Sequence, residues 1–336
     1  MSLTLDDILG TVEDLPVLLI DSDTVCFRAA AATDGRQYAV GKKVFKYKED
    51  IVKYCVKEGL PVEGIVPEFY PEPLPHALHI VKAAVNGILI HAQKKYGKVR
   101  KEFFHTGSEN FRKDILPTYK ANRIGARKPA HLNACKDYIR SRYGEVSEDG
   151  LEADDLIGIR AHQLMKAGTP YEIVSNDKDM KTIPGEYYNW VDETETVSTV
   201  TEAMKFFYAQ CIAGDTADNI PGVAGLSINN KGTGKAQKII QTAYEEFREG
   251  LASQYCNSFD TEVEFELSVN RLLELHLYEV ALNSWLEGGP SSKGSYGCHG
   301  LGYIRDEFRK SAQCLFILHH RDRLWTPPCA EWSNYD

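Results

Sequence analysis

The chain has 336 residues, of which 43% are apolar and 26% charged, and its formal net charge is −9 at pH 7. These values are typical of a globular protein with one large or two smaller domains, and no apolar run is long enough to span a membrane. The acidic N-terminus lacks a signal peptide's basic region, and eight cysteines without CxxC pairs favour reduced thiols, so we expect a cytoplasmic location.

The first 144 residues predict alternating strands and helices, because short apolar runs alternate with stretches of helical periodicity. The expected elements are a strand at 17–20, a helix at 22–32, a β-hairpin around Gly41, a helix at 49–59, a long proline-rich loop at 61–75, a helix at 76–97, a strand at 99–107, a basic loop or loose helical element at 107–130 and a helix at 131–144.

The remaining chain predicts a helix at 152–168, a strand at 171–175, a short helix at 176–183, a strand at 186–191 and then mainly helices. Strands that alternate with helices favour an α/β fold with a parallel-dominated sheet flanked by helices. We divide the chain into an α/β domain at 1–200 and a helical domain at 201–336. In parallel sheets, ligands bind beyond the carboxyl ends of the strands.

Acidic residues gather at four places where a strand should end or a helix begin. Each place alone has an ordinary explanation, such as a helix N-cap or a favourable helix dipole. Together they indicate a site for two divalent cations, which prefer oxygen ligands and can hold a phosphodiester and activate water. The candidate ligands are Asp21, Glu152, Asp154, Asp155, Asp177, Asp179, Asp215 and Asp218.

Basic residues concentrate in another part of the chain. Residues 94–128 hold eleven Lys or Arg against three Asp or Glu, whereas residues 152–218 hold thirteen acidic against five basic residues. A basic stretch beside an acidic one fits phosphate binding beside metal binding, and the alternative is two solvated faces of opposite sign. Within it, Lys120 and Arg123 share a helical face, and Tyr119 offers a ring for stacking on a base. Arg112 is a further candidate DNA contact.

Glycine turns follow the last acidic group, in the stretch from Asn219 to Lys238. Two helices joined by such turns can present backbone N–H groups to phosphate without reading bases. The candidate DNA-binding residues here are Gly222, Gly225, Gly232, Gly234 and Lys235.

The ordered set of Asp21, YKANR, EADD, NDKD, GDTADNIPG and GTGKA resembles the 5′→3′ exonuclease and flap endonuclease family, especially its small bacteriophage members. The resemblance covers roughly residues 17–245. It implies a structure-specific 5′ nuclease of PIN-like fold that acts on DNA 5′ ends, flaps, duplex and RNA primers with two Mg²⁺ or Mn²⁺ ions. It also implies a helical arch near 107–130 and a helix–three-turn–helix motif near 211–240, often with K⁺.

The resemblance further implies residue roles. Asp21, Glu152 and Asp154 would serve one metal, and Asp177, Asp179 and Asp215 the other. Asp155 and Asp218 would act directly or through water, and Lys120 and Arg123 would neutralise the scissile phosphate. In this family another aspartate usually follows the second strand, whereas this chain has Gly107 there. His105, Thr106, Glu109 or a water could fill the gap, and we expect weaker affinity for the first metal.

Two alternatives stay open. LLIDSDTV and GDTAD also fit a haloacid-dehalogenase-like phosphatase, in which Asp21 would form an aspartyl phosphate. Gly107 raises a second alternative, a DNA-junction binding module without catalysis. The resemblance implies phage DNA replication in a bacterial cytoplasm, with RNA–DNA hybrids and single-strand-binding or replication proteins as further partners and no membrane.

Overall fold

The computed structural model describes residues 15–228, 232, 234–254, 262–288, 301–321 and 323–328. The acidic N-terminal stretch and part of the second glycine turn lie outside these residues. Among the described residues, no helix is long and apolar enough to cross a membrane.

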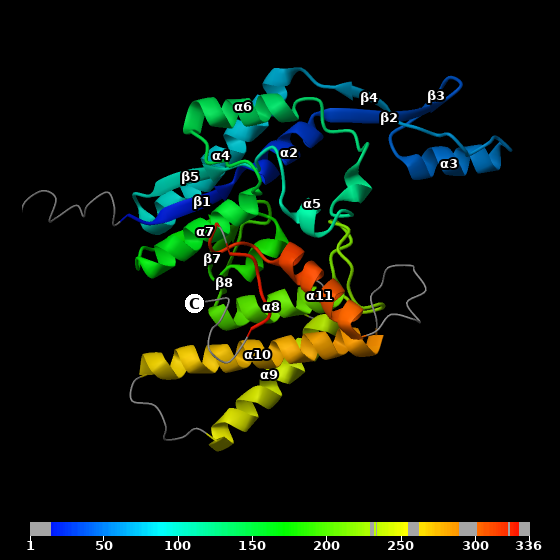
Figure 1. The fold of residues 1–336 in the computed structure, drawn as a ribbon. Helices are drawn as coiled ribbons and strands as arrows, with labels where there is room; N and C mark the ends of the chain where they lie inside the picture. The colour runs from blue at the N-terminus through cyan, green and yellow to red at the C-terminus, as the bar shows by residue number, and fades with distance from the viewer. Residues whose placement is uncertain are drawn as a thin grey trace, which may run out of the picture.

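A five-stranded sheet with the order β5-β1-β6-β7-β8 forms the centre of the fold (Figure 1). The first three pairings are parallel and only the β7–β8 pairing is antiparallel, as the α/β interpretation predicted. The strands are β1 (Val17–Asp21), β5 (Arg100–Phe104), β6 (Tyr171–Val174), β7 (Gly185–Asn189) and β8 (Thr194–Ser198). Strand β8 was missed by the sequence analysis because four of its five residues are exposed and it has no apolar run.

Helices cover both faces of this sheet. Leu18 and Ile20 of β1 pack in one core with α2 (Ser22–Ala32), α4 (Leu74–Tyr96) and α6 (Leu132–Tyr143). Val17 and Leu19 point to the other core, with α7 (Ala153–Lys166) and the C-terminal helices. These helices are α8 (Val200–Ala213), α9 (Lys235–Gln254), α10 (Glu262–Gly288) and α11 (Leu301–Leu315). Strand β1 therefore lies between the two cores, which explains its complete burial.

Residues 34–71 form a small separate layer that extends away from the central sheet (Figure 1). The expected hairpin is present, with β2 (Asp34–Val40) antiparallel to β3 (Lys43–Phe45), and α3 (Lys48–Lys57) follows. The expectation of an irregular loop at 61–75 was wrong in part, because β4 (Glu68–Pro71) pairs with β2. Proline is tolerated there because β4 is an edge strand and Pro71 stands at its end. We call residues 34–71 the insert.

The basic region at 107–130 contains only two short helical pieces, α5 (Arg112–Ile115) and the 3₁₀ turn η2 (Ala121–Arg123). Both lie against the body of the protein: Lys120 N–H donates to Asp218 O at 2.8 Å, and Arg112 reaches the C-terminal segment. The region is therefore a packed connection rather than one long arched helix.

Candidate active site

The acidic residues meet at the carboxyl ends of the parallel strands, as expected for this sheet type. Asp21 ends β1, Asp177 follows β6 as the N-cap of the 3₁₀ turn η3 (Lys178–Thr182), and Glu152 is the N-cap of α7. Asp215 and Asp218 come after α8, which packs beside η3. Residues from four separate parts of the chain are thus brought to one edge.

Asp21 is almost fully buried and is held from three directions. The backbone N–H groups of Asp23 and Thr24 donate to its Oδ1, and Ser175 Oγ donates to its Oδ2 at 2.8 Å. Burial raises the pKa of Asp21 to about 7, and the charges of Asp23 and Asp177 add to the rise, although the Ser175 hydrogen bond opposes it. The fold therefore keeps a carboxylate where its negative charge is poorly compensated.

Asp154, like Asp21, is a carboxyl group whose pKa is raised by its surroundings. Burial raises its pKa well above the ordinary range, and the nearby charges of Asp177, Asp21 and Glu152 raise it further. Crowded carboxylates of this kind are favourable only if a cation joins them. An all-oxygen donor set fits a hard divalent ion such as Mg²⁺ or Mn²⁺, so the residues present suit the metals that the sequence pattern suggests.

A second acidic group surrounds Lys178. Its Nζ lies 3.2 Å from Asp215 Oδ2 and 3.5 Å from Asp179 Oδ1. Burial raises the pKa of Asp179 to about 7, and Asp177 raises it while Lys178 opposes the rise. Gln210 of α8 donates to Asp179 Oδ1 at 2.6 Å. Lys178 was not singled out from the sequence, although its place between Asp177 and Asp179 could have indicated it.

Cationic side chains border these carboxylates. Lys120 Nζ forms an ion pair with Glu152 and lies 3.4 Å from Asp218 Oδ2, and Arg123 also pairs with Asp218. Burial opposes ionisation of Glu152, yet Arg112 and Lys120 hold the pKa of Glu152 below its usual value. Lys120 and Arg123 are therefore beside the acidic centre, where the resemblance places them.

The expected stacking role of Tyr119 is contradicted. Its side chain is only 3% exposed, and its hydroxyl donates to Glu152 Oε2 at 2.8 Å and lies 3.0 Å from Asp218 Oδ2. A buried ring cannot stack on a base, whereas a hydroxyl between two carboxylates can hold them in place. Tyr119 is thus a positioning residue in this structure.

Arg112 is likewise no DNA contact, because its guanidinium is buried. It pairs with both carboxylate oxygens of Asp155 at 2.6 and 2.8 Å and donates to the carbonyls of Cys314 and Phe316. Asp155 also accepts from the backbone N–H groups of Glu152 and Leu318. The Asp155 carboxylate thus accepts four hydrogen bonds within the protein and has no acceptor position left for an ion. The structure therefore contradicts a direct role of Asp155 in metal binding.

Gly107 lies where no side chain can be accommodated. A Cβ at this position would lie 2.1 Å from the Glu148 carbonyl oxygen, and Gly107 N–H donates to Leu151 O at 3.0 Å. His105 and Thr106 are tied to neighbouring groups, although His105 Nε2 is buried without a hydrogen-bond partner among the described residues. His105 Nδ1 and Thr106 N–H contact Asp23 at 3.1 and 3.0 Å, and Thr106 Oγ1 accepts from Ala153 N–H.

Asp23 is a site residue that the sequence analysis left aside. Burial opposes its ionisation, but His105 and Lys136 hold its pKa well below the ordinary value. Lys136 Nζ lies 2.6 Å from Asp23 Oδ1. Asp23 is already neutralised, in contrast to Asp21 two residues earlier.

An aspartate at position 107, as is usual in the family, should therefore destabilise this protein. We expect Gly107→Asp to reduce the free energy of unfolding by about 1–3 kcal/mol, because the new Cβ must displace the backbone at Glu148. Urea unfolding measures this loss. Gly107→Ala should lose a similar amount, while Gly87→Ala in α4, where a Cβ meets nothing within 4 Å, should not. A stable Gly107→Asp protein would contradict this account.

The glycine turns after Asp218 are only partly as expected. Gly225 and Gly232 adopt positive φ at exposed positions, and Lys235 is exposed at the start of α9. Gly222 instead packs against the end of α8, where a Cβ would lie 2.1 Å from Ala213 C. Gly234 N–H donates to Gln237 Oε1 at 3.1 Å. Residues 229–231 and 233 lie outside the described residues, so the helix–three-turn–helix motif stays a prediction.

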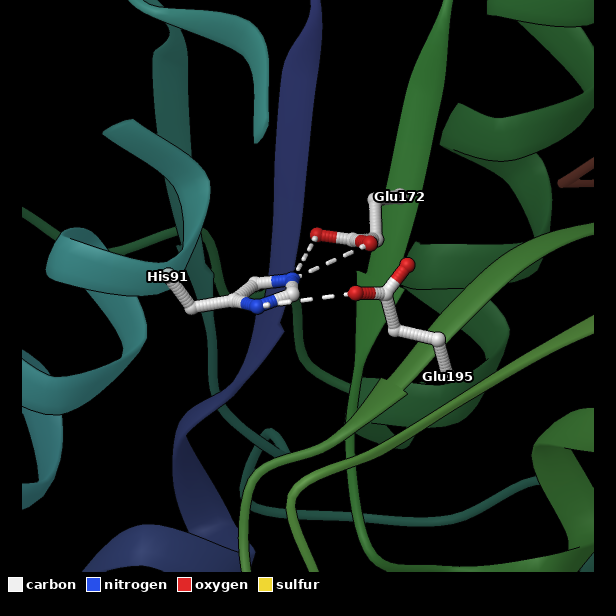
Figure 2. Close-up of side chains that lie close together, drawn as sticks. All are labelled: His91, Glu172 and Glu195. Atoms are coloured by element: carbon white, nitrogen blue, oxygen red, sulfur yellow. Dashed lines mark hydrogen bonds and ion pairs between the residues drawn. The ribbon is translucent and has the colours of Figure 1, made fainter. Parts of the chain in front are cut away.

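Figure 2 shows a different cluster, on the side of the sheet covered by α4: His91, Glu172 and Glu195. Within the described residues, these three side chains form the group of His, Cys, Asp or Glu whose ligand atoms all lie within 4.8 Å of one another. However, Glu172 faces Nε2 of the imidazole and Glu195 faces Nδ1, so the two carboxylates approach different nitrogens of the ring. Lys95 Nζ already lies 2.7–2.8 Å from Glu172, Glu186 and Glu195. Its ammonium is the cation of this cluster.

Part of the acidic centre lies in a stretch of the chain that is similar to a known protein family. Residues 77–208 match the 5′-3′ exonuclease N-terminal, resolvase-like domain. The resemblance stated from the motifs is thereby confirmed, and the matched range includes Lys120, Glu152, Asp154, Asp177 and Asp179.

Similar proteins include an exonuclease of Escherichia phage T7, 34% identical over 36% of this chain and 42% of the phage protein. A 5′-3′ exonuclease of Buchnera aphidicola from Schizaphis graminum is 30% identical over 37% of this chain and 48% of that protein. The chain thus spans less than half of these curated relatives. A solved structure of T5 5′-exonuclease with bound zinc is 17% identical, with a TM-score of 0.44 over 88% of this chain and 99% of that one.

Proposed function

We propose that this chain is a divalent-metal-dependent 5′ nuclease that hydrolyses phosphodiester bonds at DNA 5′ ends or 5′ flaps. The observation that carries the proposal is the uncompensated carboxylate cluster of Asp21 and Asp154, with Asp177 beside them, at the carboxyl ends of parallel strands. Cationic Lys120 and Arg123 border the cluster, as a phosphate site requires. The match to the exonuclease domain over residues 77–208, which include Asp154, Asp177, Lys120 and Arg123, supports the choice of a nucleic-acid substrate.

The residues divide between two metal positions in this proposal. Asp21, Glu152 and Asp154 would hold one ion, and Asp177, Asp179 and Asp215 the other. Such a pair of ions supplies charge neutralisation and an activated water for phosphodiester hydrolysis. Asp218 would act through Lys120 and Arg123, which it holds beside the site. Asp155 would act through Arg112, by fixing the start of α7 that carries Glu152 and Asp154.

The chain's own groups would prepare the site for this reaction. Lys120 is held by Glu152 and Asp218, so its ammonium can exchange one carboxylate for a phosphate oxygen when a metal occupies the cluster. Burial lowers the pKa of Lys120, but Glu152 and Asp218 outweigh this effect and raise it, which keeps the group cationic. A fixed cation is the group needed to stabilise charge that develops on a phosphate.

The wider setting is also a proposal. We place the two domains at 1–200 and 201–336, with the turns around Gly225 and Gly232 and the side chain of Lys235 binding duplex phosphates, with or without K⁺. RNA primers or RNA–DNA hybrids, and single-strand-binding or replication proteins, would be further partners. The place of action would be the cytoplasm of a bacterial host during phage DNA replication.

The deciding experiment compares a 5′-labelled duplex with a 5′-flap substrate in Mg²⁺, Mn²⁺ or EDTA. We expect metal-dependent release of a short labelled product. Asp177→Ala should abolish this release while DNA binding persists, because Asp177 adds charge to both acidic groups. Undiminished turnover by this variant would refute the assignment. Tight flap binding without any product would favour the DNA-junction binding module, and an acid-stable phosphate on Asp21 would favour the phosphatase.

A further inference from the structure

The insert contains a positively charged segment that is not part of the proposed active site. Residues 41–48, which include the turn between β2 and β3, hold Lys42, Lys43, Lys46 and Lys48 and no Asp or Glu. All four lysines are exposed, and none forms an ion pair with a carboxylate in the described part of the chain. Four unneutralised ammonium groups within seven residues favour a polyanionic partner.

Aromatic side chains lie among these lysines. Tyr47, between Lys46 and Lys48, is 52% exposed, and Lys46 Nζ lies 5.6 Å from the centre of its ring. Lys43 lies 4.2 Å from the ring centre of Tyr54 on α3. Exposed rings interleaved with lysines are typical of surfaces that bind single strands, because unpaired bases stack while the lysines bind phosphates.

The insert is also connected to the acidic centre. A cleft of about 650 Å³ is bordered by Asp23 and Asp177 at the acidic centre, and by the basic residues Arg28, Arg123, Arg127, Lys128 and Lys136. Arg127 at this cleft bonds to Asp34 at the start of β2, and its guanidinium lies 3.7 Å from the ring centre of Phe69 on β4. A nucleic-acid strand that leaves the cleft past Arg127 would therefore reach the insert.

The insert is built firmly enough to act as a binding element. It has its own core of Tyr38, Ile51 and Cys55, and β2 is paired on both sides. The four lysines at 42–48 are exposed, and among them only Lys43 contacts a described ring that packs on this core, that of Tyr54. Lys42 and Lys48 make no such contact with a described residue, so their charges are available to a partner.

We propose that residues 41–48 of the insert, from the β2–β3 turn to the start of α3, bind the single-stranded part of a tailed nucleic-acid substrate and hold it beyond the active site. This inference rests on the proposed function. Lys42, Lys43, Lys46 and Lys48 contact phosphates, and Tyr47 stacks on an unpaired base. The insert thereby favours substrates with an unpaired tail over blunt ends.

The test measures fluorescence anisotropy in EDTA with a labelled duplex that carries an oligo-dT 5′ tail, and with the same duplex without a tail. The test variant is K42Q/K43Q/K46Q/K48Q, and the control is K82Q/R142Q/K166Q/R248Q, an equal charge change at exposed positions on α4, α6, α7 and α9. We expect the test variant alone to lose affinity for the tailed duplex. The slope of log affinity against log salt should fall by about 0.7 for each lysine that contacts phosphate.

Tyr47→Ala should weaken tail binding by about tenfold without changing the salt slope. Unchanged tail binding by the lysine variant would overturn the proposal and leave the insert available for a protein partner. An equal loss on the tailless duplex would overturn the single-strand assignment. Cleavage of the tailless duplex by the lysine variant, with Mg²⁺ added, should match the wild-type rate; its presence or absence reports separately on the proposed nuclease function.

Discussion

Asp154→Asn is expected to lower metal-dependent cleavage by about 10³-fold, as loss of a charge-stabilising group in such a site does. The same change should raise the melting temperature of the metal-free protein. Asp154 is half-buried, and Asp177, Asp21 and Glu152 lie close enough to raise the pKa of Asp154, already raised by desolvation, well above the ordinary range. Asparagine keeps the shape and removes the repulsion, so activity and stability should move in opposite directions.

The pH dependence follows from the same shift. A carboxyl group whose pKa is raised by folding binds its proton more tightly in the folded state, so stability is lost as pH rises through the folded pKa. For Asp154 this loss begins above the ordinary pKa of 3.8 and continues as pH rises through the raised pKa of the folded state. The melting temperatures of Asp154→Asn and wild type should therefore be similar near pH 4 and differ most near pH 8, measured in EDTA by scanning calorimetry.

Mg²⁺ provides the matching control. The ion should stabilise the wild type by binding only the folded state, and should stabilise Asp154→Asn much less. Asp50→Asn, at an exposed position in the first turn of α3, should change neither property. If Asp154→Asn lowered the metal-free melting temperature at pH 8, the picture of an uncompensated acidic centre would be wrong.

Arg112→Met is expected to destabilise the protein by about 3–5 kcal/mol, which is the usual cost of removing one partner of a buried ion pair. Asp155 is fully buried, and without Arg112 its charge would keep only backbone N–H donors. The carbonyls of Cys314 and Phe316 would lose their donor as well. Urea unfolding measures the loss, with Arg142→Met at an exposed position of α6 as the control.

The double variant Arg112→Met/Asp155→Leu should recover part of this loss, because it removes the stranded charge. Recovery should be incomplete, since the N–H groups of Glu152 and Leu318 also bond to Asp155. A second readout addresses the role first expected for Arg112. If Arg112→Met kept wild-type stability but bound DNA more weakly with a smaller salt slope, Arg112 would be a phosphate contact after all.

Local patterns indicated much of the scaffold. VLLI at 17–20 is a short apolar run, and it forms the fully buried β1. The alternation around Gly41 indicated the β2–β3 hairpin, in which Val40 pairs with Lys43. Strands β4 and β8 were not predicted, because exposed edge strands need no apolar pattern. They become evident only from their pairing with a neighbouring strand.

The DNA contacts expected of Arg112 and Tyr119 from residue type alone were wrong. Both stand in a basic stretch, where exposure to DNA is the simplest expectation, yet both are buried at 3% exposure. Their partners, Asp155 and Glu152, are 43 and 33 positions away in the chain. Burial and pairing over such separations depend on how α5 and α7 come together, which no local pattern records.

The sequence by itself determined the α/β alternation and the places where carboxylates follow strands, because strand and helix periodicity and acidic positions are local properties of the chain. Only the tertiary structure decided which of those carboxylates are left uncompensated. Asp155 is neutralised by Arg112 and Asp23 by His105 and Lys136, whereas Asp21 and Asp154 face other acids. The reason is that charge compensation depends on distance and burial, both of which are set when remote segments pack together.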